Sequence, residues 1–305
     1  MENSKSYIKF IISLLIFGSN GLVASLISLS SNEIVFLRTF IGGIFLLAIL
    51  LYQKKPLASL KNKRHFFFVV MSGVSMGISW LFLYEAYKCT GVSLATLIYY
   101  CGPVFVMILS PVLFKESFTT AKVFGFAAVL LGMLCVNINS LSGEGFSKGI
   151  LLSLLGAVFF ALMTVLNKEG FSITGIENSA ISILASCATA AVFTAVRYGI
   201  SFEIPVGSIA PIIFIGLINT GLGCYLYFSS MSSLPAQTVS VSGYLEPLSA
   251  LVFSALFLHE TLLPLQLLGA FLIIGGAAFG EFMKDRVHVD YVTIRIPLPH
   301  IAKSH

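Results

Sequence analysis

Charged side chains are scarce in this chain of 305 residues. Only 10% of the residues are Asp, Glu, Lys or Arg, 57% are hydrophobic, and the mean hydropathy is +0.97. An ordinary soluble domain carries about 25% charged residues, so this chain lacks the polar surface that would keep it in water. The composition excludes a soluble globular protein and indicates an integral membrane protein whose surroundings are the lipid bilayer.

The residues that membrane-embedded enzymes and metal sites require are also scarce. Both aspartates, Asp285 and Asp290, lie in the polar tail 284–305, so neither an intramembrane aspartyl protease nor an Mg²⁺-dependent prenyl-transfer enzyme is expected. The five cysteines are scattered without a Cys-x-x-Cys spacing, which argues against a disulfide framework or a zinc site. No Walker A motif occurs. We therefore expect no enzyme, no metal and no cofactor.

Basic residues exceed acidic ones, with a net charge of +5. The one basic cluster, KKPLASLKNKR at 54–64, is short and lies between two apolar runs, whereas nucleic-acid binding requires a dense basic patch. We expect no nucleic-acid partner. In a membrane protein such an excess of Lys and Arg reports orientation.

Long apolar runs dominate what is present. A helix needs about 20 apolar residues to cross the hydrocarbon core, and the runs show no alternation typical of a membrane barrel. The sequence predicts an all-α polytopic membrane protein. Its ten candidate spans are 7–27, 32–52, 66–87, 92–114, 120–138, 148–166, 178–199, 209–229, 237–258 and 264–283.

The distribution of Lys and Arg predicts the orientation of these spans. With the N-terminus inside, 14 of the 18 basic residues fall on the inner side and four, including Arg38, on the outer side. Positive charges favour the cytoplasm, so both termini are predicted to be cytoplasmic in a multi-pass protein of the cell (plasma or inner) membrane. The first apolar run is expected to remain as an uncleaved span.

A repeat is the main feature of the pattern. When the chain is shifted by 144 residues, 92–138 aligns with 236–282 without a gap, and six positions are identical, at Tyr, Pro, Ser, Glu and two Gly. The hypothesis is a duplication with a first five-helix repeat at 1–140, a second at 141–283 and a cytoplasmic tail at 284–305. Because five is odd, the two repeats would be inverted, as in many secondary transporters.

The repeated stretches YCGPVFVMILSPVLFKE and YLEPLSALVFSALFLHE each carry a proline about ten residues into a span, Pro103 and Pro247. A proline inside a helix lacks an N–H and clashes with the carbonyl four residues earlier, so the carbonyls of Tyr99 and Gly243 would be freed. Freed carbonyls need a partner inside the membrane. One interpretation is a hydrated cavity at these helix breaks, and the alternative is a plain kink satisfied by neighbouring helices.

Glu246 is the strongest candidate for chemistry, because a carboxylate in mid-membrane costs several kcal/mol unless it is paired, hydrated or protonated. We expect it to contact a substrate ammonium group or to couple transport to protons; the alternative is a structural carboxylate bonded to a neighbouring span. Glu85 is either a gate residue or half of a local ion pair with Lys88. Six further residues are candidates for the substrate site, although Tyr and Trp also form interfacial belts and Asn20 could be a helix contact: Tyr99, Tyr100, Tyr244, Trp80, Asn20 and Tyr225.

The ten spans, the two halves and the Pro…Glu endings of spans 4 and 9 resemble the drug/metabolite transporter superfamily, in particular its EamA-like family. FGSN at 17–20 is similar to that family's first-span motif, although Phe17 stands where tryptophan is common. The resemblance covers roughly 7–283 and implies a secondary transporter that exports amino acids or related small metabolites. The alternative within the superfamily is a carrier of organic cations, nucleosides or nucleotide sugars. The chain is expected to act as a monomer or a homodimer on a small-molecule substrate; a channel or a membrane-embedded enzyme is the alternative of another class.

Overall fold

The computed structural model describes residues 2–53, 57–90, 95, 98–114, 120–137, 146–198, 203–257 and 263–282. Every regular element within these ranges is a helix. A helix satisfies its own backbone hydrogen bonds, as a segment in lipid must. The expected all-α membrane class is therefore confirmed.

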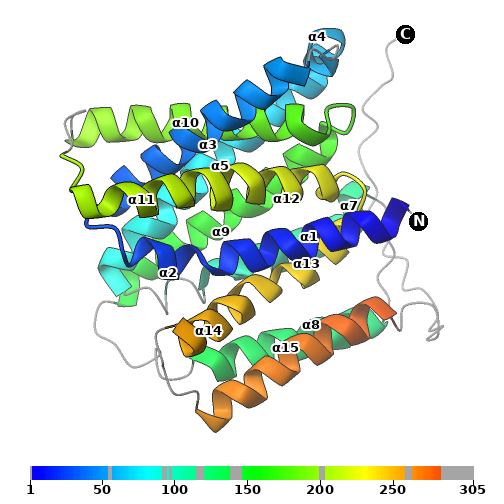
Figure 1. Cartoon of the computed structure of the whole chain (residues 1–305). Coiled ribbons are helices and arrows are strands. Elements are labelled where there is room, and N and C mark those ends of the chain that lie inside the picture. Colours follow the sequence, from blue (N-terminus) through cyan, green and yellow to red (C-terminus); the bar gives the residue numbers. More distant parts are fainter. Residues whose placement is uncertain are drawn as a thin grey trace.

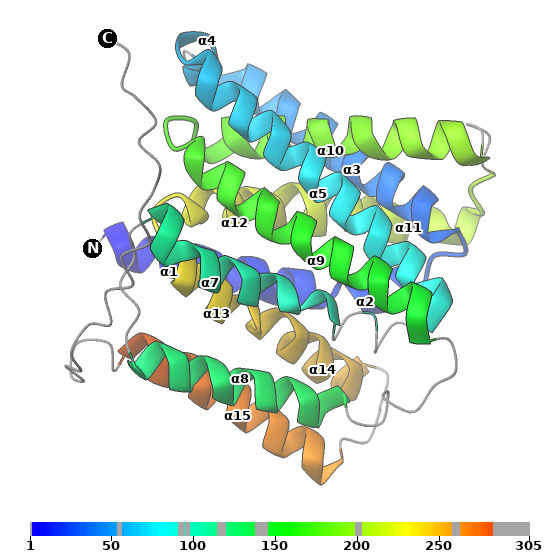
Figure 2. The same cartoon turned by 180° about the vertical axis from the view of Figure 1, so that it is seen from behind.

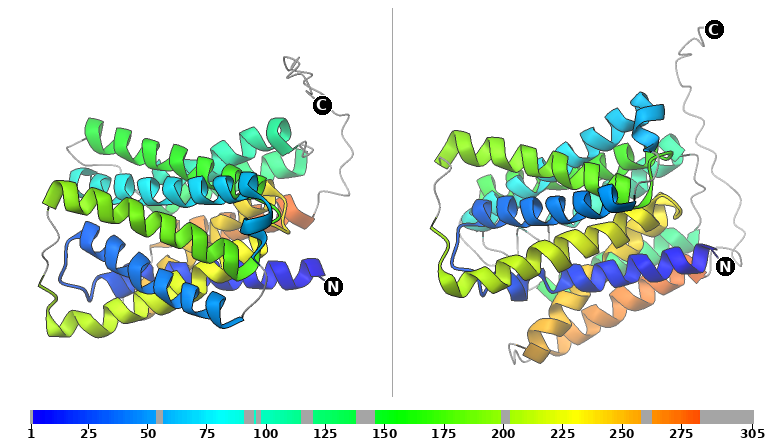
Figure 3. Two further views of the ribbon diagram at one scale, coloured as in Figure 1. Left: turned by 90° about the horizontal axis from the view of Figure 1, so that it is seen from above. Right: turned by 45° about the horizontal axis from the view of Figure 1, so that its top comes forward.

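The helices run roughly along one common direction and form an elongated bundle (Figures 1 and 3). The first half of the chain forms α1 (Glu2–Gly18), α2 (Asn20–Ala24), α3 (Ser31–Gln53), α4 (Ala58–Lys61), α5 (Lys63–Thr90), α7 (Cys101–Phe114) and α8 (Thr120–Asn137). The second half forms α9 (Phe146–Glu169), α10 (Gly175–Tyr198), α11 (Val206–Phe214), the π-helix η2 (Ile215–Leu222), α12 (Gly223–Met231), α13 (Ala236–Gly243), α14 (Leu245–Phe257) and α15 (Pro264–Phe282).

Seven helical segments in the described ranges are long and apolar enough to cross a membrane. They correspond to predicted spans 1, 2, 3, 6, 7, 8 and 9. Three shorter apolar helices, Cys101–Ser110, Thr120–Cys135 and Leu267–Gly276, fall in predicted spans 4, 5 and 10. The chain is thus a multi-pass membrane protein, and the count of ten spans stays a prediction.

Two of the spans are interrupted three residues before their prolines. Helix α13 ends at Gly243, α14 begins at Leu245, and Pro247 is the third residue of α14. Likewise α7 begins at Cys101, directly after a turn at Tyr100. The sequence predicted that each proline would break a helix and free a carbonyl. Instead, each proline lies in the first turn of a helix that begins after the break. A proline there loses no hydrogen bond, because the first four N–H groups have no partner within the helix.

The helix pairs are related by an exchange of the two halves of the chain. Helix α5 packs on α9 and α1 packs on α12; α7 packs on α9 and α1 packs on α14; α5 packs on α10 and α3 packs on η2. In each case, replacing every span by its equivalent in the other half, five places later or earlier, gives the other pair. The pairs α3 with α10, α7 with α13 and α8 with α15 convert into themselves.

Helices α8 and α15 lie side by side along one edge of the molecule (Figures 1 and 2). A Cβ atom added to Gly125 would lie 2.5 Å from the carbonyl oxygen of Gly276, and one added to Gly132 would lie 2.6 Å from that of Gly269. These glycines bring the two backbones into contact. The order of the contacts shows that the two helices are antiparallel.

Candidate functional site

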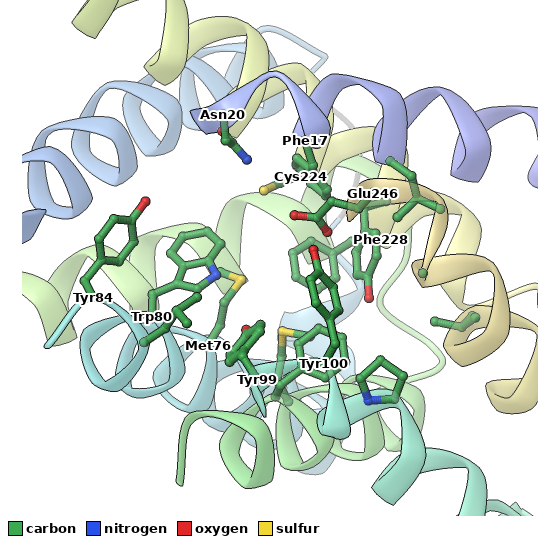
Figure 4. Close-up of a pocket in the computed structure, with 18 of the residues that line it drawn as sticks. Phe17, Asn20, Met76, Trp80, Tyr84, Tyr99, Tyr100, Cys224, Phe228 and Glu246 are labelled. Atoms are coloured by element: carbon green, nitrogen blue, oxygen red, sulfur yellow. The ribbon is translucent and has the colours of Figure 1, made fainter. Parts of the chain in front are cut away.

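A cavity lies between the two halves of the bundle, at the helix interruptions (Figure 4). Its volume is about 150 Å³, enough for several water molecules or a small organic ligand. The wall is formed by Leu14, Phe17, Asn20, Arg38, Met76, Trp80, Leu83, Tyr84, Tyr99, Tyr100, Pro103, Phe160, Met163, Cys224, Tyr227, Phe228, Val239, Gly243 and Glu246.

The interruption in span 9 places Glu246 on this wall. Glu246 is the second residue of α14, so its carboxylate lies at the start of a new helix inside the membrane. Unpaired N–H groups and the helix dipole make such a position favourable for an anion. Figure 4 shows the carboxylate pointing into the cavity rather than toward a neighbouring span. No described residue donates a hydrogen bond to it.

Arg38 from α3 is the second charged residue of the wall. Its side chain is only 3% exposed, its Nε donates a 2.9 Å hydrogen bond to Thr220 Oγ1, and its guanidinium lies 4.9 Å from the centre of the Trp80 ring. The distribution of basic residues predicted Arg38 on the outer side. The structure places Arg38 inside α3, where it borders the cavity.

A π-helix holds Arg38 in place. In η2 the hydrogen-bonding step is one residue longer than in an α-helix, a geometry often found at functional sites. Thr220 Oγ1 donates to the carbonyl of Ile215, five residues earlier, at 2.9 Å, which leaves its lone pairs to accept from Arg38. The π-helix therefore fixes the acceptor that orients the guanidinium.

Arg38 and Glu246 attract each other electrostatically but form no ion pair. Among the described residues of the wall, they are the two that carry a formal charge. The wall of the cavity thus carries one cation, Arg38, and one anion, Glu246, which do not contact each other as an ion pair. Most of the remaining wall is aromatic or aliphatic. The cavity is suited to a small molecule that carries complementary charges.

Asn20 is the first residue of α2, directly after the interruption of span 1. Its Oδ1 is buried without a hydrogen-bond partner, and Figure 4 shows the amide directed into the cavity. The interruption itself is stabilised from η2, because Asn219 Nδ2 donates to the Ile16 carbonyl at 2.8 Å and to Ser19 Oγ at 2.9 Å. The carbonyl freed by the break is thereby satisfied.

Tyr99 and Tyr100 directly precede α7 and enter the wall, with Tyr100 in the turn. The hydroxyl of Tyr99 lies 3.0 Å from Ser79 Oγ, and Ser79 donates its own proton to the Gly156 carbonyl at 2.8 Å, so Tyr99 is the donor. Across the cavity from Glu246, Trp80 and Tyr84 project from α5 (Figure 4). Aromatic faces of this kind bind cations and flat groups.

The structure gathers most of the predicted site residues around one cavity and leaves four outside it. Asn20, Trp80, Tyr99, Tyr100, Pro103, Gly243 and Glu246 line it, whereas Tyr225, Tyr244, Glu85 and Pro247 do not. Tyr244 is fully buried behind the wall and donates its hydroxyl to the Tyr100 carbonyl. Glu85 accepts a 3.4 Å hydrogen bond from Asn32, while the side chain of Lys88, its expected partner, lies outside the described residues.

Tyr227 takes the place that was predicted for Tyr225. Tyr225 and Tyr227 are two positions apart, which corresponds to about 200° around a helix, so only one of their side chains can face the cavity. Tyr227 lines the wall and packs on Phe17 with ring centres 5.8 Å apart. Arg38, Thr220 and Asn219 were not predicted as site residues; the one signal in the sequence was an arginine placed six residues into a predicted span.

A serine with a hydrolase-like spacing, Gly73-x-Ser75-x-Gly77, lies nearby on α5. Its Oγ donates to the Met71 carbonyl at 2.8 Å within the same helix, and Ser75 is buried. In hydrolases this spacing is used on an exposed strand-to-helix turn. The local geometry here is that of a packing serine.

These features define a class: a polytopic membrane protein with a polar cavity between two halves at broken helices. The EamA-like transporter family matches this chain twice, over residues 4–138 and 147–280. The chain belongs to the EamA-like transporter family, within the drug/metabolite transporter superfamily.

Relatives agree with this assignment. The chain is 26% identical over 284 residues to "Uncharacterized transporter YxxF" of Bacillus subtilis (strain 168), which covers 91% of this chain and 89% of the relative. It is 26% identical over 261 residues to "Uncharacterized transporter YoaV" of the same organism, covering 82% and 87%. A solved protein crystal structure superposes with a TM-score of 0.79 over 93% of this chain and 99% of the other, at 20% identity, and shows the same fold.

Proposed function

We propose that this protein is a secondary transporter that moves small polar metabolites, in the first place amino acids and related compounds, out of the cell by alternating access. The observation that carries the proposal is the cavity that both halves build at the interrupted helices, with Glu246 and Arg38 on its wall. Polar groups of this kind inside a membrane mark a substrate path. The names of the relatives support a transporter.

The arrangement of the helices supports two inverted five-helix repeats, 1–140 and 141–283. Each cross-pair of helices has a counterpart after exchange of the halves, and the equivalent helices α8 and α15 are antiparallel. A two-fold relation in the membrane plane allows one bundle to rock against the other and to open the same cavity to alternate sides. This proposal includes the cell membrane as the location and a cytoplasmic N-terminus, which lies at the same end of the bundle as α4 (Figure 1).

Proton linkage through Glu246 is part of the proposal. A carboxylate on the wall of a hydrated cavity can exchange a proton with water on whichever side the cavity is open. If substrate ammonium and proton compete for this carboxylate, entry of one proton drives exit of one substrate. Energy from the proton gradient would then support export against a concentration gradient.

A carrier of organic cations is the second candidate. Glu246 and the aromatic surface of Trp80, Tyr84 and Tyr99 favour it, because both attract cations. Arg38 disfavours it, because a buried guanidinium on the same wall repels a substrate that carries only positive charge. The two candidates therefore differ in what Arg38 would do.

The experiment is uptake of labelled amino acids into proteoliposomes with an imposed pH gradient. Wild type should accumulate at least one amino acid above equilibrium, and an uncoupler should abolish that accumulation. Glu246→Gln should fold normally but lose uphill flux, whereas the matched control Glu169→Gln, at the end of α9 and off the cavity wall, should behave as wild type. Uphill flux in Glu246→Gln equal to wild type would remove this carboxylate from the mechanism.

A further inference from the structure

The guanidinium of Arg38 has donors to spare. Of its five N–H groups, the one on Nε is used by Thr220 Oγ1, and the guanidinium carbon lies over the Trp80 ring, 4.9 Å from the ring centre. The two Nη atoms form no hydrogen bond or ion pair with any described residue, although Arg38 is only 3% exposed. A buried arginine without a paired anion is costly, so its free edge calls for a ligand.

The ligand type follows from the shape of that edge. Two coplanar Nη groups match the two oxygens of a carboxylate in a bidentate pair, which a lysine cannot reproduce. The contact with the Trp80 ring and the hydrogen bond to Thr220 together restrict the movement of the guanidinium. The guanidinium is thus preorganised before a ligand arrives, which lowers the entropy lost on binding.

The remainder of the wall provides the opposite charge. Glu246 accepts no hydrogen bond from the described residues and lines the cavity. Its carboxylate is therefore an acceptor for an ammonium group. A molecule with only a carboxylate would be repelled by Glu246, and one with only an ammonium group would be repelled by Arg38.

We propose that Arg38 is the carboxylate-binding residue of this cavity and that the substrate is a zwitterion, its carboxylate on Arg38 and its ammonium group on Glu246. This rests on the proposed transport function and specifies the chemistry of that same site. Thr220 is a positioning residue, because it acts only through Arg38. The inference excludes simple amines and simple carboxylates as good substrates.

The first test measures ligand-induced thermal stabilisation of the purified full-length chain. The probes are the twenty common L-amino acids, followed, for each one that stabilises, by its decarboxylated amine and its deaminated acid. For leucine these are 3-methylbutan-1-amine and 4-methylpentanoate. At least one amino acid should stabilise the wild type, and both of its analogues should bind about thirtyfold or more weakly, as expected when one buried charge is left unpaired. Stabilisation by no amino acid would overturn the proposal, as would an amine that equals its parent.

The second test exchanges the preferences. Arg38→Gln should lose the amino acid but gain affinity for the amine, since the repelling cation is gone. Glu246→Gln should lose the amino acid and gain affinity for the acid. Unchanged selectivity in Arg38→Gln would overturn the role of Arg38. Arg38→Lys keeps the charge but not the planar fork, so it should bind about tenfold more weakly with the same order of preference.

Thr220→Val keeps the shape of the side chain and removes the acceptor for Nε. It should weaken amino-acid binding by about threefold to tenfold, the value of one hydrogen bond, and leave binding of the amine analogue unchanged. This variant keeps the proposal testable if Arg38→Gln does not fold. An equal loss for both probes would indicate a merely structural Thr220 and contradict the positioning role.

The outcomes separate this inference from the transport proposal. Arg38-dependent binding of a zwitterion without flux in proteoliposomes would support the binding site and contradict transport. Flux of an amine at the wild-type rate in Arg38→Gln would support transport and contradict the zwitterion site.

Discussion

The hydroxyl of Tyr244 donates a 2.7 Å hydrogen bond to the main-chain carbonyl of Tyr100, the residue that stands 144 positions earlier in the chain. Tyr100 and Tyr244 are equivalent positions of the repeated pattern, and each forms the turn before a proline-containing helix. Their rings lie 5.9 Å apart. The two helix interruptions therefore contact each other directly at the centre of the molecule.

We expect Tyr244→Phe to lower the stability of the protein by about 0.5–1.5 kcal/mol, the net contribution of one buried hydrogen bond. The ring and its packing are retained, so the loss reports the bond to the Tyr100 carbonyl. The measurement is thermal unfolding in detergent. Tyr225→Phe is the control, because no described residue bonds its hydroxyl, and it should unfold like wild type; equal midpoints for the two variants would show that the bond contributes nothing.

Gly276→Ala and Gly275→Ala should differ sharply although the positions are adjacent. A Cβ at Gly276 would lie 2.5 Å from the Gly125 carbonyl oxygen, while a Cβ at Gly275 has no neighbour within 4 Å. Overpacking costs about 1–3 kcal/mol, whereas alanine in an unobstructed helix position gains up to about 1 kcal/mol. We therefore predict a lower unfolding midpoint for Gly276→Ala and an unchanged or higher one for Gly275→Ala. The reverse order would mean that α8 and α15 do not meet at this face.

Glu177 ties the basic connection of the first half to the second half. Its carboxylate accepts hydrogen bonds from the backbone N–H groups of Ala58 at 3.0 Å and Ser59 at 2.8 Å, at the start of α4. Glu177→Ala should cost about 0.5–2 kcal/mol, as loss of a helix cap does, and Glu177→Gln should cost less because one acceptor oxygen remains. Proteolysis of the 54–64 connection should accelerate in the same order. Equal cleavage of wild type and Glu177→Ala would contradict the capping role.

The sequence was sufficient for the all-helical membrane class and for the family, because both depend on coarse features; the count of ten spans and the inversion of the repeat stay predictions. An apolar run long enough for a membrane is visible without knowledge of its neighbours. Pairs such as Gly125 with Gly269 stand out because apolar composition alone does not supply them. The cavity residues Glu246 and Asn20 could be predicted for a similar reason, because they are polar residues in apolar stretches of the sequence.

The sequence was insufficient where the role of a residue depends on the direction in which its side chain points. The π-helix at Ile215–Leu222 changes the rotation of α12 relative to a regular 3.6-residue count. Tyr227 faces the cavity, whereas Tyr225, two positions earlier, does not. In the sequence, Arg38 stands near the start of a span, where a charge at the membrane–water interface is expected. Its contacts with Thr220 and Trp80 are visible only in the structure, where Arg38 is buried. Tyr244 was expected in the wall because it is close to Pro247, but its side chain points at the other half of the chain.

Accessibility of the cavity from both sides of the membrane is the most direct test of the account. Gly243 lines the cavity and has room for a side chain, and Gly275 has equal room but lies on the exposed outer face of α15. Each is replaced by cysteine in a variant without the five native cysteines, and a membrane-impermeant maleimide is added to right-side-out and inside-out vesicles. The account predicts that Gly243→Cys reacts in both preparations while Gly275→Cys reacts in neither until it is denatured. A Gly243→Cys protein that stays unreactive from both sides in the membrane, yet reacts once unfolded, would contradict the transport cavity.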